Sequence, residues 1–254
     1  MQKLQLKSVT KHFGGVHAAQ SVSFNVEQGS IHGLIGPNGS GKSTIFNCLT
    51  GVYPLTSGEV YFDNKRIDGK YPHQIASSGI ARTFQNLRLF SGLTVLENIL
   101  IGRHIHMKTG VWGSILGRYA SKTEHHKALT KSTELANMCG LQGRENELSK
   151  DLPYGLQRRL EIARALAIEP TFLMLDEPAA GMNNSESQSL QELIHSIHNL
   201  GITILLIEHN VKLVMGICER ITVMEVGSVI AEDSPENIVN NARVIEAYLG
   251  KEDD

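Results

Sequence analysis

The chain has 254 residues, and its 24 Lys and Arg stand against 26 Asp and Glu, so its formal net charge is −2. This length fits one large domain or two small ones, and folding removes roughly 70–75% of the unfolded surface from water. The near-neutral balance argues against a basic nucleic-acid-binding protein, so we expect no nucleic-acid partner. The three cysteines show neither metal-ligand nor disulfide spacing, which indicates a reducing compartment.

The apolar segments are short. The longest runs, such as residues 202–207 (ITILLI), fall far below the ~20 residues that a membrane-spanning helix needs. Residues 1–13 (MQKLQLKSVTKHF) lack the apolar middle section of a secretory signal. We therefore expect a chain that is neither secreted nor membrane-spanning. One excess is left to explain, since the 24 glycines are about 9% of the residues against a usual ~7%.

The first 70 residues predict strands and one helix. Residues 21–26 (SVSFNV) alternate polar with apolar side chains, as a half-buried strand does, and residues 60–67 predict a hairpin. Residues 31–35 (IHGLI) form a short apolar run that leads into a glycine-rich loop. A helix is expected over residues 42–49, closed by Gly51 in the left-handed cap position.

The middle of the chain predicts helices. Two capping boxes, residues 94–97 (TVLE) and 121–124 (SKTE), predict helix starts, because their side chains satisfy the first free backbone amides. Residues 110–117 (GVWGSILG) are expected to form a loop or a short helical excursion. Helices are therefore expected over about 94–103, 121–139 and 155–168.

The last third returns to strands alternating with helices. Residues 172–175 (FLML) and 202–207 are near-continuous apolar runs, which is typical of parallel strands buried on both faces. Ser185 with Gln188 forms another capping box and predicts a helix start between these two strands.

Residues 36–44 (GPNGSGKST) match the phosphate-loop pattern GxxxxGK[ST], with the predicted strand before it and the predicted helix after it. The glycines let backbone amides turn inward around an anion, and the helix N-terminus adds about half a positive charge. Lys42 is expected to reach the β- and γ-phosphates and Ser43 to bind Mg²⁺. The alternative is a glycine-rich turn without a ligand. The expected nucleotide contacts are Gly36, Pro37, Asn38, Gly39, Ser40, Gly41, Lys42, Ser43 and Thr44.

Two carboxylates follow the buried strand predicted at residues 172–175. Asp176 is placed to hold Mg²⁺ through water, and Glu177 is placed to polarise an attacking water. The alternative is that Asp176 caps a helix. With the phosphate loop present, the pair predicts hydrolysis of a nucleotide.

On these motifs the chain resembles the ATP-binding subunits of ABC transporters over essentially its whole length. Residues 83–85 (TFQ) look like the Q-loop, residues 152–165 (LPYGLQRRLEIARA) stand where the family signature LSGGQ stands, and residues 180–183 (AGMN) occupy the D-loop position. Residues 207–209 (IEH) look like the switch-histidine segment. Phe13 matches the aromatic residue that stacks on adenine, although a lone Phe is more often a core residue.

The resemblance implies roles for these residues. Catalysis would be carried by Glu177, His209, Gln85 and Lys42, and Gly155 would face an ATP bound to the opposite subunit. The implied Mg²⁺ ligands are Ser43, Gln85 and Asp176.

The resemblance also implies an α/β fold of the P-loop NTPase (RecA-like) type. A parallel-sheet core would carry an antiparallel β subdomain and an inserted α-helical subdomain. A single domain would span residues 1–254, with the nucleotide-binding core in 1–85 and 166–254 and the helical subdomain, with the signature, in 86–165.

More narrowly, the chain resembles the LivG-type ATPases of branched-chain amino-acid importers. The similarity lies in residues 13–15 (FGG), 81–86 (ARTFQN), 176–181 (DEPAAG), 208–210 (EHN) and 244–250 (VIEAYLG). It implies ATP-driven uptake through separate permease subunits, at the cytoplasmic face of the inner or plasma membrane. Urea or another solute, lipopolysaccharide export, and a soluble ABC ATPase without a transport role are the alternatives.

The resemblance implies three kinds of partner. Permease subunits would dock on the region from Gln85 to Phe90, a second ABC ATPase chain would complete the dimer, and a solute-binding protein would act indirectly. For the apolar side chains of residues 86–90, core packing is the alternative to docking. A heterodimer is favoured, and a homodimer stays open.

The signature departs from the family pattern at two positions. Pro153 replaces a serine whose hydroxyl and amide face the γ-phosphate of the opposite subunit, and Leu156 replaces a glutamine. Proline has no N–H to donate, so the ATP site that this signature completes is expected to be weakened. We therefore hypothesise an asymmetric pair of ATP sites.

The chain contains 11 histidines, which raises the question of a metal site. The close pairs are His104 with His106, His125 with His126, and His195 with His198, but no Cys or carboxylate cluster completes a ligand set. Solvated surface histidines are the better interpretation.

Overall fold

The computed structural model describes residues 1–106 and 119–249; the loop predicted at residues 110–117 lies outside the described residues. The chain forms two compact units. The core unit comprises Met1–Arg82 and Thr171–Asp254, and the helical unit comprises Thr83–Pro170. In the described part of the chain, no helix has the length and apolar character needed to span a membrane.

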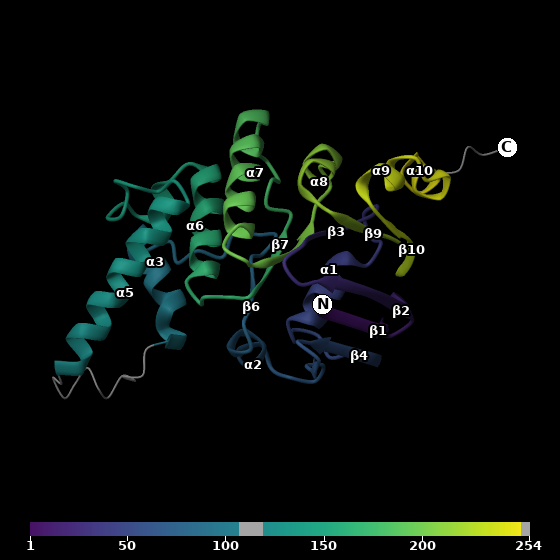
Figure 1. Ribbon diagram of the computed structural model, residues 1–254, viewed down its shortest axis with the longest axis horizontal. Coiled ribbons are helices and arrows are strands. Elements are labelled where there is room, and N and C mark those ends of the chain that lie inside the picture. Colours follow the sequence, from purple (N-terminus) through teal and green to yellow (C-terminus); the bar gives the residue numbers. More distant parts are fainter. Residues whose placement is uncertain (107–118, 250–254) are drawn as a thin grey trace. The chain divides into compact units, whose positions relative to one another are not determined.

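The core unit contains two sheets (Figure 1). The smaller is antiparallel and has the order β2-β1-β4-β5. In the larger, β9, β3, β8, β7 and β6 are parallel, and β10 pairs antiparallel with β9 at one edge. The strands are β1 (Gln2–Phe13), β2 (Val16–Glu27), β3 (Ile31–Ile35), β4 (Ser57–Phe62), β5 (Lys65–Arg66), β6 (Ile80–Arg82), β7 (Phe172–Asp176), β8 (Thr203–Ile207), β9 (Arg220–Glu225) and β10 (Ser228–Asp233).

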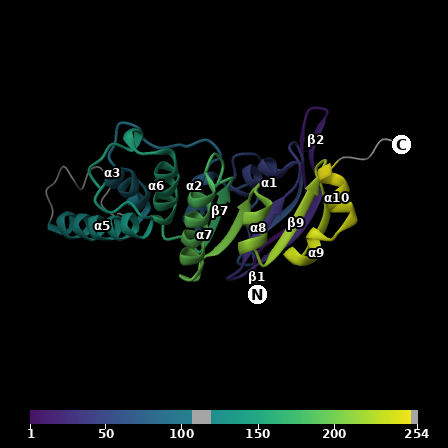
Figure 2. The same ribbon diagram turned by 90° about the horizontal axis from the view of Figure 1, so that it is seen from above.

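The helices of the core unit cover the larger sheet on both faces. α7 and α8 lie on one face, and α1 lies on the other (Figures 1 and 2). Every residue of β3, β7 and β8 is consequently buried, as their near-continuous apolar runs predict. The helices are α1 (Lys42–Leu49), α2 (Pro72–Ser77), α7 (Asn184–His198), α8 (Val211–Ile217), α9 (Pro235–Val239) and α10 (Ala242–Leu249).

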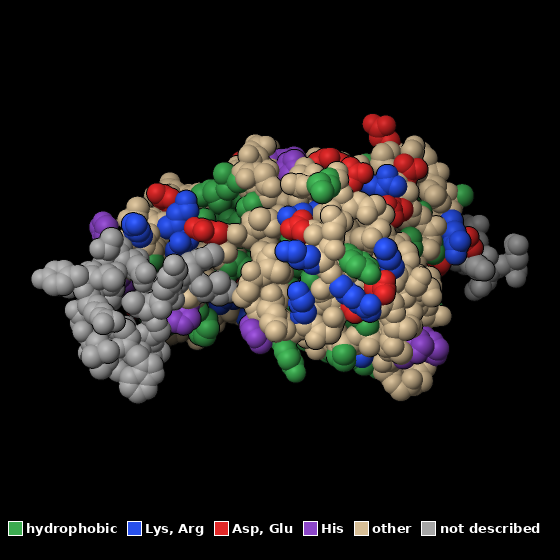
Figure 3. Space-filling view, turned by 60° about the horizontal axis from the view of Figure 1, so that its bottom comes forward, with side chains coloured by type: hydrophobic (Ala, Val, Ile, Leu, Met, Phe, Trp, Pro, Cys, Tyr) green, Lys and Arg blue, Asp and Glu red, His purple; other side chains and the backbone are tan. Residues whose placement is uncertain are grey.

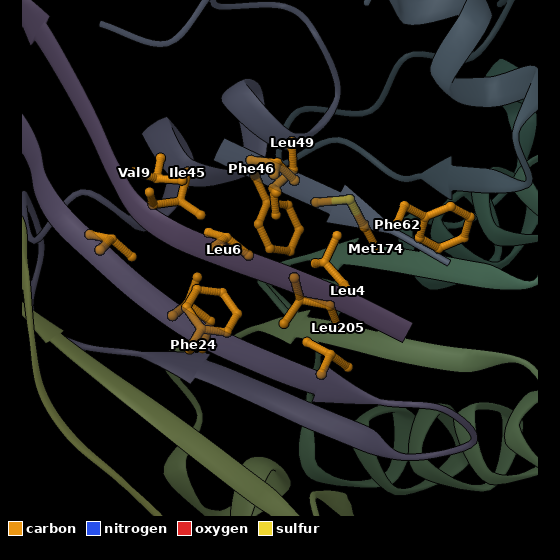
Figure 4. Close-up of a cluster of buried hydrophobic side chains, with 14 of the residues drawn as sticks. Leu4, Leu6, Val9, Phe24, Ile45, Phe46, Leu49, Phe62, Met174 and Leu205 are labelled. Carbon is orange, nitrogen blue, oxygen red and sulfur yellow. The ribbon is translucent and has the colours of Figure 1, made fainter. Parts of the chain in front are cut away.

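The hydrophobic core of this unit lies between the two sheets and around α1 (Figure 4). Leu6 from β1 and Phe24 from β2 meet Phe46 from α1 there, and Leu205 of β8 closes the cluster from the parallel sheet. Each of these side chains is at most 3% exposed. The helix that follows the phosphate loop is therefore fixed by packing on both sides, which holds the loop itself in place.

Charged side chains of both signs are scattered over the outer face of the smaller sheet (Figure 3). Lys3 pairs with Asp63 at 2.9 Å, and Arg66 pairs with both Glu59 and Asp68. On this face, the charges of Lys3 and Arg66 are therefore neutralised locally.

The helical unit is built around α3, α5 and α6. Thr94 caps α3 through the predicted box, with its hydroxyl accepting from the Glu97 N–H at 3.2 Å. The box predicted at residues 121–124 is wrong, because α5 already includes Tyr119. The elements are α3 (Val95–Gly102), a 3₁₀ turn (Arg103–His106), α5 (Tyr119–Met138), a second 3₁₀ turn (Ser149–Asp151) and α6 (Tyr154–Leu166).

The helix start predicted at Ser185 is also wrong. Asn183 is the N-cap of α7, and its side chain accepts from the Glu186 N–H at 3.0 Å while Glu186 bonds back to the Asn183 N–H at 2.9 Å. The sequence contains two overlapping capping boxes, Asn183 with Glu186 and Ser185 with Gln188, and the structure forms the first.

A buried histidine makes the stability of the core unit depend on pH. His32 on β3 is 1% exposed and bonds Thr222 at 2.8 Å, and burial, assisted by the charge of Arg220, lowers the pKa of its imidazole to about 4. Between pH 6.5 and 4 the imidazole of His32 therefore binds a proton in the unfolded chain but not in the folded chain. The free energy of unfolding should fall as pH drops below 6.5, by about 3 kcal/mol once pH is below 4.

We expect His32→Gln to lose this part of the pH dependence, because glutamine does not titrate but can still bond Thr222. Urea unfolding of both proteins between pH 7.5 and 4.5 measures it. Parallel stability profiles for the two proteins would contradict the assignment.

Candidate nucleotide-binding site

The phosphate loop connects β3 to α1 and requires glycine at two positions. A Cβ on Gly36 would lie 2.0 Å from the carbonyl oxygen of Met224, and one on Gly41 would lie 2.2 Å from that of Ala18. Both residues also have positive φ, 148° and 100°. The loop is thus pressed against β2 and the end of β9, and the Gly227 N–H adds a bond to the Ser40 carbonyl at 3.0 Å.

Lys42 folds over this loop. Its ammonium donates to the carbonyls of Gly36 at 2.7 Å and Pro37 at 2.9 Å, and to the Ser40 hydroxyl at 3.2 Å. Burial lowers the pKa of Lys42, while the charges of Glu177 and Asp176 act in the opposite direction. Those two carboxylates therefore lie close enough to the Lys42 ammonium to act on its charge. The ammonium, the phosphate loop and the two carboxylates form one site.

The carboxyl ends of β7 and β8 supply the acid and the histidine. Glu177 follows β7 with a left-handed backbone, φ 48°, and its N–H bonds the carbonyl of Ile207 at the end of β8. This conformation directs its side chain to His209, whose Nε2 lies 2.8 Å from the carboxylate. A carboxylate paired with a histidine is suited to orienting water and stabilising developing charge.

Glu208 was not assigned a role from the sequence, and the structure gives it one. Its side chain is 3% exposed and accepts from the Ala179 N–H at 2.7 Å, the His209 N–H at 3.0 Å and the Asn210 N–H at 3.2 Å. Burial raises the pKa of this carboxyl, and the three bonds oppose that shift. Glu208 thus ties the segment after β7 to the segment that carries His209.

Arg82 at the end of β6 holds Asp176. Its guanidinium donates to Asn47 and Thr50 at 2.8 Å each and to Asp176 at 3.4 Å. Both side chains of the ion pair are nearly buried, with 11% and 4% exposed. Arg82 therefore fixes the carboxylate relative to α1.

The residues present fit a Mg²⁺ ion bound together with a nucleotide. No group of three or more His, Cys, Asp or Glu side chains able to hold a metal occurs among the described residues. Mg²⁺ bound with phosphates needs only one or two protein oxygens, which the Ser43 hydroxyl and Asp176 would supply. Bound there, the ion would neutralise charge on the phosphates.

We predict that Arg82→Lys raises the Mg²⁺ concentration needed for half-maximal ATP binding by roughly tenfold, because groups that orient metal ligands are typically worth 10–100-fold. Lysine cannot make the three directed bonds of Arg82. Titrating Mg²⁺ against a fluorescent ATP analogue measures this. Arg66→Lys, at an exposed arginine that also pairs with carboxylates, is the matched control. An unchanged Mg²⁺ midpoint in Arg82→Lys would remove this role.

Phe13 ends β1 as an exposed aromatic side chain. It is 41% exposed, contacts Tyr53 edge-on at 5.1 Å, and lies under the Lys11 ammonium at 4.7 Å. It is therefore not a core residue, the alternative that the sequence left open for a lone Phe.

The last described helix reaches the phosphate loop. Val244 of α10 is buried, and the backbone of Gly36 lies close enough to the Tyr248 hydroxyl to lower its pKa. Burial has the larger effect and raises that pKa above its ordinary value. Nothing in the sequence pattern links position 248 to the loop.

Gln85 and Gly155 belong to the helical unit, whereas the other predicted site residues belong to the core unit. Gln85 is exposed, and Pro153 is the N-cap of α6, with no side-chain cap bond. The Pro153 carbonyl accepts from Leu156 and Gln157, so the helix begins regularly despite the proline.

Comparison with known proteins places this site in a family. Residues 19–180 match the ABC transporter family model, and residues 228–254 match the branched-chain amino acid ATP-binding cassette transporter model. The high-affinity branched-chain amino acid transport ATP-binding protein LivG of Salmonella typhimurium is 45% identical over 249 residues, 98% of each chain.

Two solved structures resemble the whole fold. A nucleotide-free ATP-binding cassette from an ABC transporter has a TM-score of 0.86 at 32% identity, covering 99% of this chain and 100% of that one. A dimeric cassette bound to ADP and Pi has a TM-score of 0.78 at 26% identity, covering 91% and 98%. The chain belongs to the ABC transporter family of ATP-binding cassettes, and the predicted fold class is confirmed.

Proposed function

We propose that the chain is the ATP-hydrolysing subunit of an importer for branched-chain amino acids. The observation that carries the hydrolytic role is the Glu177–His209 hydrogen bond beside the phosphate loop. The similarity to LivG over nearly the full length supports the substrate class.

In this proposal the residues of Gly36–Thr44 bind the phosphates of ATP, and Phe13 stacks on the adenine. Ser43, Asp176 and Gln85 would hold Mg²⁺, and Lys42 stabilises negative charge on the phosphates. Glu177 takes a proton from the attacking water at its carboxylate, while His209 orients that carboxylate. Asp176 is only 3% exposed, which supports a strong attraction between its carboxylate and a bound cation, because buried charges interact through a low dielectric.

The partners are permease subunits and a second ATPase chain, at the cytoplasmic face of the membrane. The permeases dock on the region from Gln85 to Phe90 in the helical subdomain. Phe90 is 49% exposed there, which argues against the core-packing alternative at this position. The second chain contributes its signature to the ATP bound here, and Gly155 of this chain faces the ATP of the second one.

Reconstitution tests the proposal directly. The chain is assembled in liposomes with its permeases and second ATPase, and phosphate release is measured with a leucine-loaded binding protein. We expect leucine to stimulate hydrolysis and urea, with a urea-binding protein, to have no effect. Stimulation by urea alone would assign the alternative solute, and hydrolysis indifferent to every binding protein would contradict a role in import.

A further inference from the structure

A buried ion pair in the helical unit connects two segments far apart in the sequence. Arg158 and Glu161 on α6 lie 3.2 Å apart, with only 3% and 1% of their side chains exposed. Removing two charges from water is expensive, and replacing a buried ion pair by apolar residues of similar volume is often neutral or stabilising. The pair therefore needs a reason beyond stability.

The bonds made by the pair supply that reason. The Arg158 guanidinium donates to the carbonyls of Phe84, at 2.7 Å, and Gln85, and the Glu161 carboxylate accepts from the Phe84 N–H at 3.3 Å. Arg158 also donates to the Tyr154 hydroxyl at 3.2 Å and lies over that ring. One arginine thus contacts both the segment at Gln85 and the first residue of α6.

The other end of the same segment is fixed as well. Asn98, fully buried on α3, accepts from the Phe90 N–H at 2.9 Å and donates to the Phe90 carbonyl at 3.1 Å. The Ser149 hydroxyl bonds that carbonyl at 2.9 Å. Residues 84–90, which we call the anchored segment, are therefore held at both ends by backbone bonds, while the side chains of Asn86 and Arg88 between them are exposed.

We propose that Arg158 and Glu161 are a positioning pair that fixes the backbone of Phe84 and Gln85 to the start of α6, so that Gln85 and the signature segment move together. This inference rests on the proposed function, in which Gln85 would bind the Mg²⁺ that accompanies the ATP of this chain and Gly155 would face the ATP of the partner chain. A displacement of the anchored segment by a docked permease would then reach both ATP sites at once.

The test replaces the pair without emptying its space. The double variant Arg158→Met/Glu161→Leu keeps an apolar filling but loses every bond to Phe84 and Gln85. We expect faster hydrogen–deuterium exchange in residues 84–90, unchanged exchange in residues 36–44 and an unchanged KM for ATP. In the reconstituted transporter kcat should fall by roughly 10- to 100-fold, as displacement of a positioned group by about 1 Å does.

Two further variants separate positioning from simple stability. Arg158→Lys keeps the charge pair but lacks the planar fork that spans two carbonyls, so we expect it to retain the fold and behave like the double variant. Arg144→Met/Glu147→Leu is the matched control, since it removes a half-buried Arg–Glu pair of the same spacing in the same unit, 2.8 Å apart. It should leave exchange and kcat unchanged.

The outcomes are distinct. Unchanged exchange in residues 84–90 of the double variant would overturn the positioning role, and so would faster exchange with a wild-type kcat. If Arg158→Lys behaves like the wild type, the pair serves only to balance charge and does not position the segment. A wild-type assembly that hydrolyses no ATP contradicts the proposed function instead, because the exchange measurement needs no turnover.

Discussion

Glu177→Gln is expected to lower the kcat for ATP hydrolysis by about 10²–10⁴-fold, the usual contribution of a positioned general base. The amide has the size of the carboxylate and can still accept a hydrogen bond from His209, 2.8 Å away, but it cannot take a proton from water. ATP binding should persist, because Lys42 and the loop amides are untouched. Hydrolysis-dependent opening of the dimer should therefore stop, and the ATP-bound pair should accumulate.

Phosphate release, binding of a fluorescent ATP analogue and size-exclusion chromatography measure the three effects separately. Glu192→Gln, at an exposed carboxylate on α7, is the control and should match the wild type. Steady-state turnover near the wild-type level in Glu177→Gln would overturn the role of Glu177. Loss of ATP binding would instead show that the carboxylate shapes the loop, to which it is linked electrostatically through Lys42.

The parts of the site that the sequence predicts are those that depend on local geometry. Residues 36–44 form a loop between a strand and a helix, so the spacing of the glycines and Lys42 is fixed by the turn itself. Asp176 and Glu177 follow an apolar run whose burial on both faces is visible in its composition. In both cases the chemistry lies within a few residues of the structural signal.

The supporting residues could not be found in this way, because their partners are distant in the chain. Arg82 meets Asp176 across 94 positions, and Glu161 meets Phe84 across 77. Such contacts depend on strand order and on how a helix rotates about its axis, which no local pattern contains. The sequence instead presents Arg158 and Glu161 as an ordinary helical pair three residues apart, the kind that usually faces solvent.

Helix starts were ambiguous for a different reason. Asn183 with Glu186 and Ser185 with Gln188 both satisfy the capping-box pattern, and propensity alone separates Asn and Ser very little. The Met182 N–H bonds the Ala179 carbonyl, so the turn after β7 brings the chain into position for a cap at Asn183. Tertiary context therefore chose between two locally equivalent starts.

The second large effect concerns the two ATP sites of the proposed heterodimer. Lys42→Ala should abolish most turnover, whereas the same change at the corresponding lysine of the second ATPase should cost far less. The reason is Pro153, which lacks an N–H at the position where the family signature faces the γ-phosphate. Losing one such donor typically lowers the rate by ~10²–10³-fold. The ATP bound by the second chain is completed by this weakened signature.

The Lys42→Ala assembly also provides the sharper test, because its remaining hydrolysis comes from the site that the signature of this chain completes. Adding Pro153→Ser restores both a hydroxyl and an N–H at the start of α6, where the proline carbonyl already begins the helix regularly. We expect turnover of the Lys42→Ala assembly to rise with this second change and to stay low without it. Subunit content of the purified assemblies controls for loss of the complex. Equal losses of turnover from the two lysine changes, with no gain from Pro153→Ser, would mean that the two ATP sites work alike. Tyr154, Gly155 and the N-terminus of α6 would then hold the phosphate without the missing donor.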